Sequence, residues 1–181
     1  MRNSNLPILN KTGNIDIYHT IDQDNFKQVQ YVGMLSISHA LTGAFIASKL
    51  THPALYLPLT LAAHYFEDWV PHWDVGTGLS TGKRKKSTAI ILEFAELGVT
   101  LGLLALFCYD KPQELWLHIG LAAFTGLVPD FLEAPRNFLK WEPFFLKPFN
   151  DFHNLFHHST PNMMLGLLPQ VILVVGVFLL G

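Results

Sequence analysis

The chain has 181 residues, which is enough for one domain and short for two ordinary hydrophobic cores. Half of the residues are hydrophobic and only 14% are charged, against roughly a quarter in a typical soluble domain, so the composition favours a membrane protein. The net charge of −2 argues against a nucleic-acid-binding protein, and the single cysteine excludes an intrachain disulfide.

The first 30 residues are polar and contain no apolar central region. We therefore expect neither a cleavable signal peptide nor a membrane span in this part of the chain. We interpret residues 1–30 as a soluble N-terminal arm and residues 31–181 as a single membrane helical domain.

Long apolar segments begin at Tyr31, and a helix that crosses about 30 Å of hydrocarbon needs about 20 residues. The candidate segments cover about 31–50, 54–69, 88–108, 114–132 and 162–181. The segment 54–69 is the shortest, and Pro58 suits a first helical turn better than a helix interior. A tilted, a re-entrant and a partly buried helix remain alternatives for it. The sequence thus predicts an all-α, polytopic membrane helical bundle of about five spans.

The distribution of lysine and arginine predicts the orientation, because these residues are enriched in cytoplasmic loops. With the N-terminus inside, only Lys49 and Lys111 of the 12 basic residues fall in outside loops. We therefore expect a multi-pass protein of the inner (cell) membrane with a cytoplasmic N-terminus. The basic run 83–86 is then a topology signal and a contact for anionic membrane lipid.

The segment 133–161 is rich in aromatic side chains and is not a simple linker. Pro135, Pro143 and Pro148 divide it into short pieces. Aromatic side chains can be half buried at the membrane surface, so we expect short interfacial helices here.

Histidines and carboxylates collect at the predicted inner end of the spans. His64 and Asp68 are four residues apart and share one helical face, and His72 and Asp74 follow directly after that helix. The topology places the other members at the same membrane face: His39, Glu93, Glu96, Asp130, His153, His157 and His158. Three further histidines are expected outside this cluster: His19, His52 and His118.

Carboxylates inside membrane spans are costly, at about 2.5 to 3.5 kcal/mol for a charged residue near a helix centre. Asp68, Glu93 and Glu96 therefore need compensation, from a divalent cation, a water-filled cleft or a partner such as Arg136. A mixed set of nitrogen and oxygen ligands suits zinc first, with manganese or iron as alternatives.

Each residue of the cluster, taken alone, also has a simpler interpretation. His39 is compatible with an ordinary packing histidine, and Glu93 and Glu96 are compatible with hydrogen bonds between helices. The residues around Ser159 are compatible with a helix cap before Pro161. The joint placement of imidazoles and carboxylates on one side is what favours a metal site.

Four short motifs of this chain resemble a known family: His39-Ala-Leu-Thr-Gly43, His64-Tyr-Phe-Glu-Asp68, Pro71-His72-Trp73-Asp74 and Leu127-Val-Pro-Asp130. They are similar to the small predicted membrane-bound metal-dependent hydrolases of bacteria and archaea, which more remotely resemble the zinc-dependent phospholipase C and nuclease group. The likeness covers roughly residues 31–160. It implies that the first candidates for metal ligands or their immediate partners are His39, His64, Asp68, His72, Asp74 and Asp130.

That family often has a His-Arg-Gly-x-x-His-Ser segment, and residues 153–159 (HNLFHHS) resemble it in both histidines and the serine. Asn154 replaces the arginine and Leu155 replaces the glycine, so the resemblance implies the metal ligands of the segment but not phosphate recognition.

The sequence therefore predicts a membrane-embedded metal-dependent hydrolase that acts on a phosphoester or lipid-linked substrate at the cytoplasmic face. Beside His39, we expect the metal ligands to be His64, Asp68, His72, Asp130, His153, and His157 or His158. One of Glu67, Asp74 and Glu96 is the expected general base. A non-catalytic metal-binding membrane protein (a permease, a sensor or a structural site) and a metal-free scaffold remain alternatives. The oligomeric state and the number of ions stay open.

Overall fold

The computed structural model describes residues 36–79 and 82–181, so the predicted soluble arm and the first residues of the first predicted span lie outside the described part. The described elements are all helical: α1 (Ser36–Lys49), α2 (Pro53–Trp69), α3 (Lys86–Cys108), α4 (Gln113–Ala134), the π-helical segment η2 (Pro135–Leu139), α5 (Lys147–His153) and α6 (Met163–Leu180). The predicted all-α class is confirmed.

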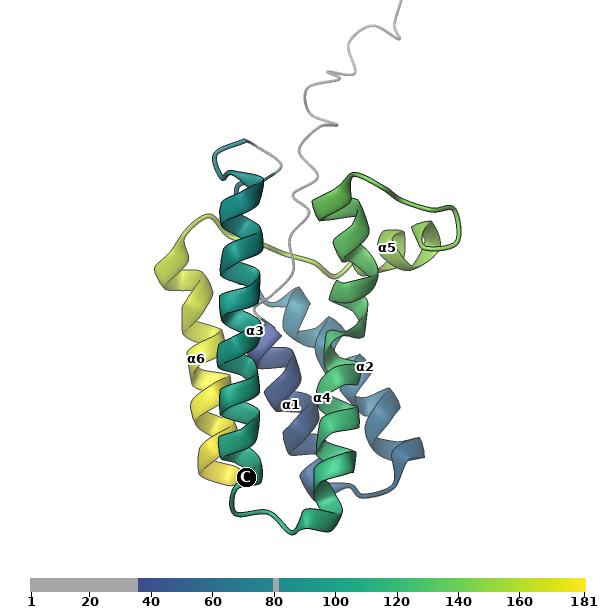
Figure 1. Cartoon of the computed structure of the whole chain (residues 1–181), viewed down its shortest axis with the longest axis vertical. Coiled ribbons are helices and arrows are strands. Elements are labelled where there is room, and N and C mark those ends of the chain that lie inside the picture. Colours follow the sequence, from purple (N-terminus) through teal and green to yellow (C-terminus); the bar gives the residue numbers. More distant parts are fainter. Residues whose placement is uncertain (1–35, 80–81) are drawn as a thin grey trace, which may run out of the picture.

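The long helices form an antiparallel bundle with α1 in its centre (Figure 1). Helix α1 packs against α2, α3, α4 and α6. Its buried residues are mostly small, which lets several neighbours approach one short helix closely: Ser36, Ser38, His39, Ala40, Leu41, Gly43, Ala44 and Ala47.

Two glycines set the distance between α1 and α4. A Cβ atom on Gly43 would lie 2.4 Å from the carbonyl oxygen of Ala122, and one on Gly126 would lie 2.5 Å from the carbonyl oxygen of His39. Real Cβ atoms do not approach backbone so closely, so only glycine permits this crossing. The crossing brings the backbone at His39 directly against α4.

Three helices are long and apolar enough to cross a membrane: α3, the continuous helix Gln113–Leu139 formed by α4 and η2, and α6. Helices α1 and α2 have 14 and 17 described residues, fewer than the roughly 20 that a perpendicular span needs. The structure thus gives three possible spans, and the five-span arrangement stays a prediction.

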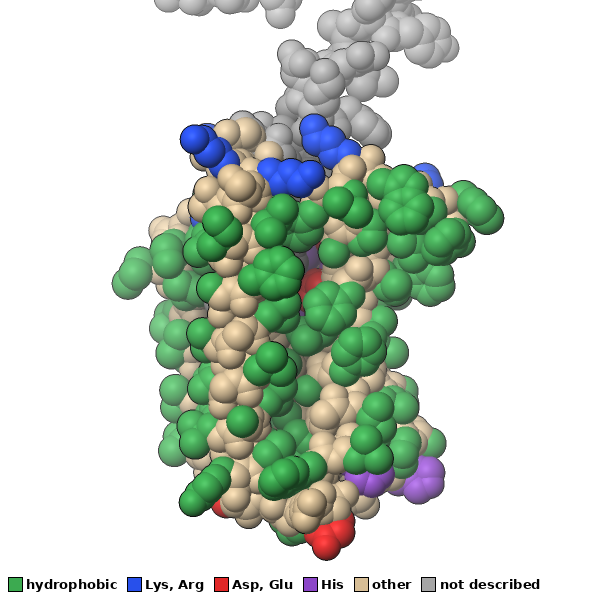
Figure 2. Space-filling model, in the orientation of Figure 1, with side chains coloured by type: hydrophobic (Ala, Val, Ile, Leu, Met, Phe, Trp, Pro, Cys, Tyr) green, Lys and Arg blue, Asp and Glu red, His purple; other side chains and the backbone are tan. Residues whose placement is uncertain are grey.

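The two ends of the bundle differ in charge. Figure 2 shows lysine and arginine side chains at the end where α3 begins and α4 ends, above a surface that is largely hydrophobic. The basic run 83–86 immediately precedes or opens α3 at this end. The short helices η2 and α5 lie here too, with strongly exposed aromatic residues such as Phe144 and Phe149 around them. The aromatic segment thus contains one separate short helix, α5, whereas η2 continues α4 through Pro135 instead of starting a new piece. The place of this segment at a membrane interface stays a prediction.

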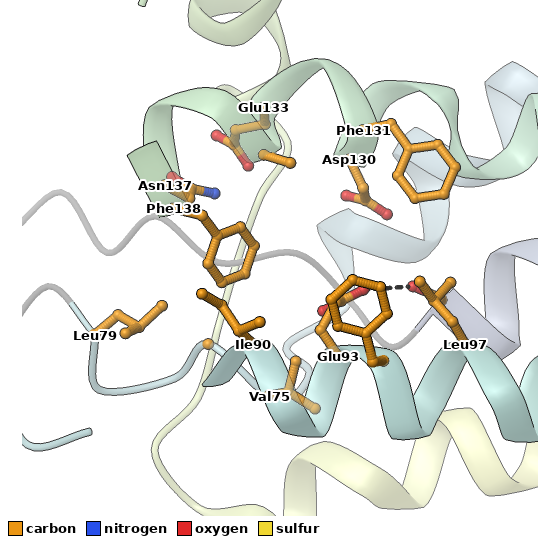
Figure 3. Close-up of a pocket in the computed structure, with 14 residues that line it drawn as sticks. Val75, Leu79, Ile90, Glu93, Leu97, Asp130, Phe131, Glu133, Asn137 and Phe138 are labelled. Carbon is orange, nitrogen blue, oxygen red and sulfur yellow. Dashed lines mark hydrogen bonds between the residues drawn. The ribbon is translucent and has the colours of Figure 1, made fainter. Parts of the chain in front are cut away.

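A pocket of about 330 Å³ lies between the loop that follows α2, the first turns of α3, and the last turns of α4 with η2 (Figure 3). Apolar residues make up most of its wall, and Glu93, Asp130, Glu133 and Asn137 are its charged and amide members. Asp130 also belongs to the histidine and aspartate cluster described next, so the pocket adjoins that cluster.

Candidate metal centre

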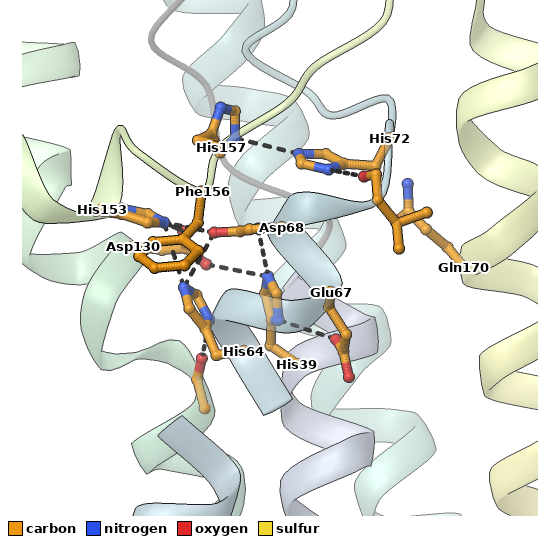
Figure 4. Close-up of polar contacts among 12 residues, drawn as sticks. His39, His64, Glu67, Asp68, His72, Asp130, His153, Phe156, His157 and Gln170 are labelled. Atoms are coloured by element: carbon orange, nitrogen blue, oxygen red, sulfur yellow. Dashed lines mark hydrogen bonds and ion pairs between the residues drawn. The ribbon is translucent and has the colours of Figure 1, made fainter. Parts of the chain in front are cut away.

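Histidine and aspartate side chains from four helices and two loops meet near the basic end of the bundle (Figure 4). Helix α1 supplies His39, α2 supplies His64 and Asp68, α4 supplies Asp130, and α5 supplies His153. The loops after α2 and α5 add His72 and His157. Five of these residues are at most 1% exposed: His39, His64, Asp68, His72 and His153.

A first group consists of His39, His64, Asp68 and Asp130, whose ligand atoms all lie within 4.8 Å of one another. The Nε2 atom of His39 is 3.3 Å from Asp68 Oδ1 and 3.8 Å from Asp130 Oδ2, and the Nε2 atom of His64 is 3.2 Å from Asp68 Oδ2. Ligand atoms bonded at about 2.0 to 2.1 Å to a tetrahedral zinc ion stand roughly 3.3 Å apart. The spacing therefore suits one divalent cation, and this group could hold it.

His153 lies at the edge of the first group. Its Nε2 atom is 3.3 Å from His64 Nε2, 2.5 Å from Asp68 Oδ2 and 3.8 Å from Asp130 Oδ1. It is thus placed as a further nitrogen donor beside the same carboxylates.

A second group consists of Asp68, His72 and His157, so Asp68 belongs to both groups. The Nε2 atoms of His72 and His157 are 3.1 Å apart. Burial lowers the pKa of His157 to about 3 and also lowers the pKa of His72, so both imidazoles are neutral near pH 7. The neutral form is the one that binds a metal ion.

Backbone hydrogen bonds between the two loops hold the second group in place. The amide of His72 donates to the carbonyl oxygen of His158 at 3.1 Å, and the amide of Thr160 donates to the carbonyl oxygen of His72 at 2.8 Å. The amide of His158 also donates to the carbonyl oxygen of Asp68 at 3.0 Å. These bonds join chain segments that are more than eighty residues apart in the sequence.

Four of the imidazoles have an oxygen acceptor near the Nδ1 atom. The contacts are His64 with the carbonyl oxygen of Gly126 at 2.7 Å, His72 with that of Val70 at 2.9 Å, His39 with Glu67 Oε2 at 3.0 Å and His153 with Glu133 Oε2 at 3.6 Å. The carbonyl acceptors at His64 and His72 favour the tautomer with its proton on Nδ1 and a lone pair on Nε2, whereas the Nδ1 atoms of His39 and His153 lie near a carboxylate without a hydrogen bond of acceptable geometry. Metal-binding histidines commonly have such outer contacts.

Several polar atoms at the centre of the cluster lack a hydrogen bond of acceptable geometry within the described protein. They are His39 Nε2, Asp68 Oδ1 and both carboxylate oxygens of Asp130. A buried carboxylate without a partner costs several kcal/mol by order of magnitude. A cation between these atoms would satisfy all of them, so the residues present fit a metal ion.

The proposed base residues lie around the cluster rather than in either group. Glu67 contacts His39 as described. Asp74 accepts hydrogen bonds from the amide of Gly76 at 2.8 Å and the hydroxyl of Thr77 at 3.1 Å, within the loop after α2. Glu96 accepts from the amide of Ile37 at 3.3 Å, and so contacts the start of α1.

Among the remaining histidines, the structure separates two that the sequence groups together. His157 joins the second group, whereas the side chain of His158 is exposed and its Nδ1 atom lies 2.7 Å from the carbonyl oxygen of Phe156. His118 contacts the hydroxyl of Tyr56 and His52 caps α2, both away from the cluster as predicted. His19 lies outside the described residues.

Backbone carbonyl acceptors are the part of the site that sequence reasoning missed. Nothing in the sequence distinguishes the carbonyl oxygens of Gly126 and Val70 from those of other residues. Glu133 Oε2 lies 3.6 Å from His153 Nδ1, and Arg136 forms an ion pair with Glu133 and donates a 3.1 Å hydrogen bond to Asn154.

Comparisons with known proteins find no protein-family model, curated protein or solved structure that matches this chain. The family resemblance therefore rests on the quoted motifs alone.

Proposed function

We propose that this protein is a membrane-embedded metal-dependent hydrolase that acts on a phosphoester or lipid-linked substrate at the cytoplasmic face. The observation that supports this proposal is the convergence of imidazole Nε2 atoms and two aspartates in two adjoining groups that share Asp68, with the Nδ1 atoms of His64 and His72 hydrogen-bonded to backbone carbonyl oxygens. A bundle that only had to pack would gain more from apolar side chains at these positions.

His39, His64, Asp68 and Asp130, with His153 beside them, would hold one ion. Asp68, His72 and His157 would hold a second, with the Asp68 carboxylate shared between the ions. The nitrogen-rich set suits zinc best, with manganese and iron as alternatives. A bound ion of this kind lowers the pKa of its water toward about 7 and polarises a phosphoryl or carbonyl oxygen.

The other side chains of the site would orient the ligands and receive a proton. Glu67 lies beside Nδ1 of His39, and Glu133, paired with Arg136, lies beside Nδ1 of His153, so each carboxylate would orient its ring when the site is loaded. Glu67, Asp74 and Glu96 remain candidates for the general base. Glu93 joins them because it lines the pocket together with Asp130.

The membrane arrangement is part of the same proposal. We infer five spans from the five apolar segments, and an inner-membrane location with a cytoplasmic N-terminus from the basic run 83–86 at the start of α3. Membership of the predicted membrane-bound metal-dependent hydrolases is likewise a proposal, supported by the motifs that supply His39, His64, Asp68, His72 and Asp130.

A non-catalytic metal-binding membrane protein is the second candidate. The near-complete burial of five candidate ligands favours it, because structural metal sites are closed whereas catalytic sites keep an open position. A permease fits less well, since the contact between His118 and the hydroxyl of Tyr56, at the opposite end of the described bundle, is only partly buried.

Elemental analysis of the purified protein tests the proposal, beside a His64→Ala/Asp68→Ala variant. We expect a divalent metal in the natural protein, little in the variant, and phosphatase or phospholipase activity that a chelator removes and the metal restores. Equal, near-zero metal in both proteins would remove the enzyme and the metal-binding candidates together. Metal without activity would favour the non-catalytic candidate, and activity after complete demetallation would contradict the mechanism.

A further inference from the structure

Asp130 is the member of the first metal group that lines a pocket. Its side chain is 16% exposed although both of its carboxylate oxygens are buried, whereas the side chains of His39, His64 and Asp68 are completely buried and that of His153 is 2% exposed. Asp130 also lines the pocket between α3 and α4 (Figure 3). Among the four residues of this group, only Asp130 is a wall residue of that pocket, so a molecule in the pocket lies beside the group.

The pocket opens on a face of the bundle that is suited to hydrocarbon. Phe94 on α3 and Phe131 on α4 line it and are 71% and 39% exposed. Both belong to helices that are long and apolar enough to cross a membrane. Figure 2 shows acidic and histidine side chains at the bottom of a hollow between α3 and α4, below the basic end.

The depth of the polar groups matches the boundary between lipid head groups and acyl chains. Glu93 follows Lys86 by seven residues, which corresponds to a rise of about 10 Å along α3. The head-group layer on each side of a bilayer is roughly 5 to 8 Å thick. With the exposed lysines of the run 83–86 placed at the head-group level, Glu93 lies just beneath it, and Asp130 lines the same pocket as Glu93.

The size and chemistry of the pocket fit one end of an amphiphile. A volume of about 330 Å³ lies at the lower end of the range for small-molecule sites, and Ile90, Leu97 and Phe138 continue its apolar wall. The basic run attracts anionic head groups, whereas Glu93 and Asp130 would repel them without a neutralising cation. An anionic head group beside a bound cation is attracted by the basic run and is not repelled by Glu93 and Asp130, because the cation neutralises these carboxylates.

We infer that this pocket admits an anionic phospholipid sideways from the bilayer, with an acyl chain along the walls of α3 and α4 and the phosphate group at Asp130. The inference rests on the proposed function and names the substrate class of its site. A water-soluble phosphoester would need no apolar entrance between two membrane-facing helices.

The experiment uses metal-loaded protein in phosphatidylcholine vesicles that contain phosphatidic acid with a photoreactive acyl chain. We expect cross-links within 90–97 and 131–138. Ala134→Trp fills the pocket, because Ala134 is half-buried in its wall, and Ile90→Trp fills it from α3. Ala105→Trp is the matched control, because Ala105 is exposed on the same helix outside the pocket. Both pocket variants should lose cross-linking and phosphatidic acid hydrolysis roughly tenfold, and the control should lose neither.

Metal content and hydrolysis of soluble p-nitrophenyl phosphate separate the possible failures. Unchanged metal content in Ala134→Trp or Ile90→Trp shows that the centre has folded. Equal cross-linking in all variants, or cross-links outside the pocket, overturns the entry of phospholipid through this pocket. The proposed function still stands in that case if the soluble ester is cleaved. Cross-links in the pocket without hydrolysis of either ester support the lipid site and overturn the hydrolase.

Discussion

The Nδ1 atom of His64 donates a hydrogen bond of 2.7 Å to the carbonyl oxygen of Gly126. The same glycine lies against the carbonyl oxygen of His39, at a distance that leaves no room for a Cβ atom. One residue of α4 therefore positions a histidine from α2 and the backbone of a histidine from α1. The packing of the bundle and the geometry of the candidate metal centre depend on the same contact.

Replacing Gly126 with alanine should damage stability and metal binding together. The added Cβ would push α1 away from α4, and overpacking of this kind costs about 1 to 3 kcal/mol. The displaced His39 and His64 should weaken metal binding by roughly tenfold or more. Thermal unfolding in detergent and chelator competition measure the two effects.

Gly120→Ala is the matched control, because it lies on the same helix with no atom within 4 Å of its added Cβ. This variant should be as stable as the natural protein or slightly more stable, since alanine favours helix over glycine by about 1 kcal/mol. If Gly126→Ala binds metal as tightly as Gly120→Ala, the helix crossing does not position the ligands.

The sharing of Asp68 between two groups predicts a characteristic pattern of metal stoichiometry. We expect two ions per chain in the natural protein, one in His157→Ala and almost none in Asp68→Asn, because only Asp68 contributes to both groups. Inductively coupled plasma mass spectrometry on equally folded samples measures the ratio. A natural protein with one ion, or equal losses in the two variants, contradicts the shared carboxylate.

The contact between Glu67 and His39 predicts an effect on affinity that a conservative variant should rescue. The Glu67 carboxylate lies 3.0 Å from His39 Nδ1 and is largely buried. Loss of such an outer contact lowers metal affinity by about 10- to 100-fold, so Glu67→Ala should show this loss. Glu67→Gln keeps an acceptor oxygen and should recover most of the affinity. Chelator competition measures both.

Glu114→Ala provides the control for removing a carboxylate, because Glu114 is exposed at the opposite end of the bundle. It should bind metal like the natural protein. Equal affinity in Glu67→Ala and Glu114→Ala would show that His39 needs no support from Glu67.

Long apolar segments made most of the fold predictable, because hydrophobic length is a direct physical requirement of a membrane helix. The predicted segments 88–108 and 162–181 differ from α3 and α6 by at most two residues at either end. The continuation of α4 through Pro135 into η2 was not predicted, since proline usually ends a helix. A π-helical turn accommodates it here.

For the site, the sequence allowed a prediction of the residue types and of the end of the bundle at which they lie. The spacing predicted His64 and Asp68 on one helical face, and the structure brings their side chains together with those of His39, His72, Asp130, His153 and His157. Their role as metal ligands stays a prediction. The choice between His157 and His158 depends on how the loop before α6 pairs with the loop after α2. Such long-range backbone pairing has no local sequence signal, and neither do the carbonyl acceptors at Nδ1.

The orientation of α3 gives a final prediction, which concerns the membrane rather than the metal. Helix α3 has 23 residues and a length of about 34 Å, enough to cross about 30 Å of hydrocarbon. Lys85 and Asp110 flank it and are exposed. In a Cys108→Ser background, a membrane-impermeant maleimide should label Asp110→Cys in intact cells and Lys85→Cys only after permeabilisation, because basic loops stay in the cytoplasm. The opposite pattern would place the metal site outside, and labelling of both cysteines from one side would show that α3 does not cross the membrane.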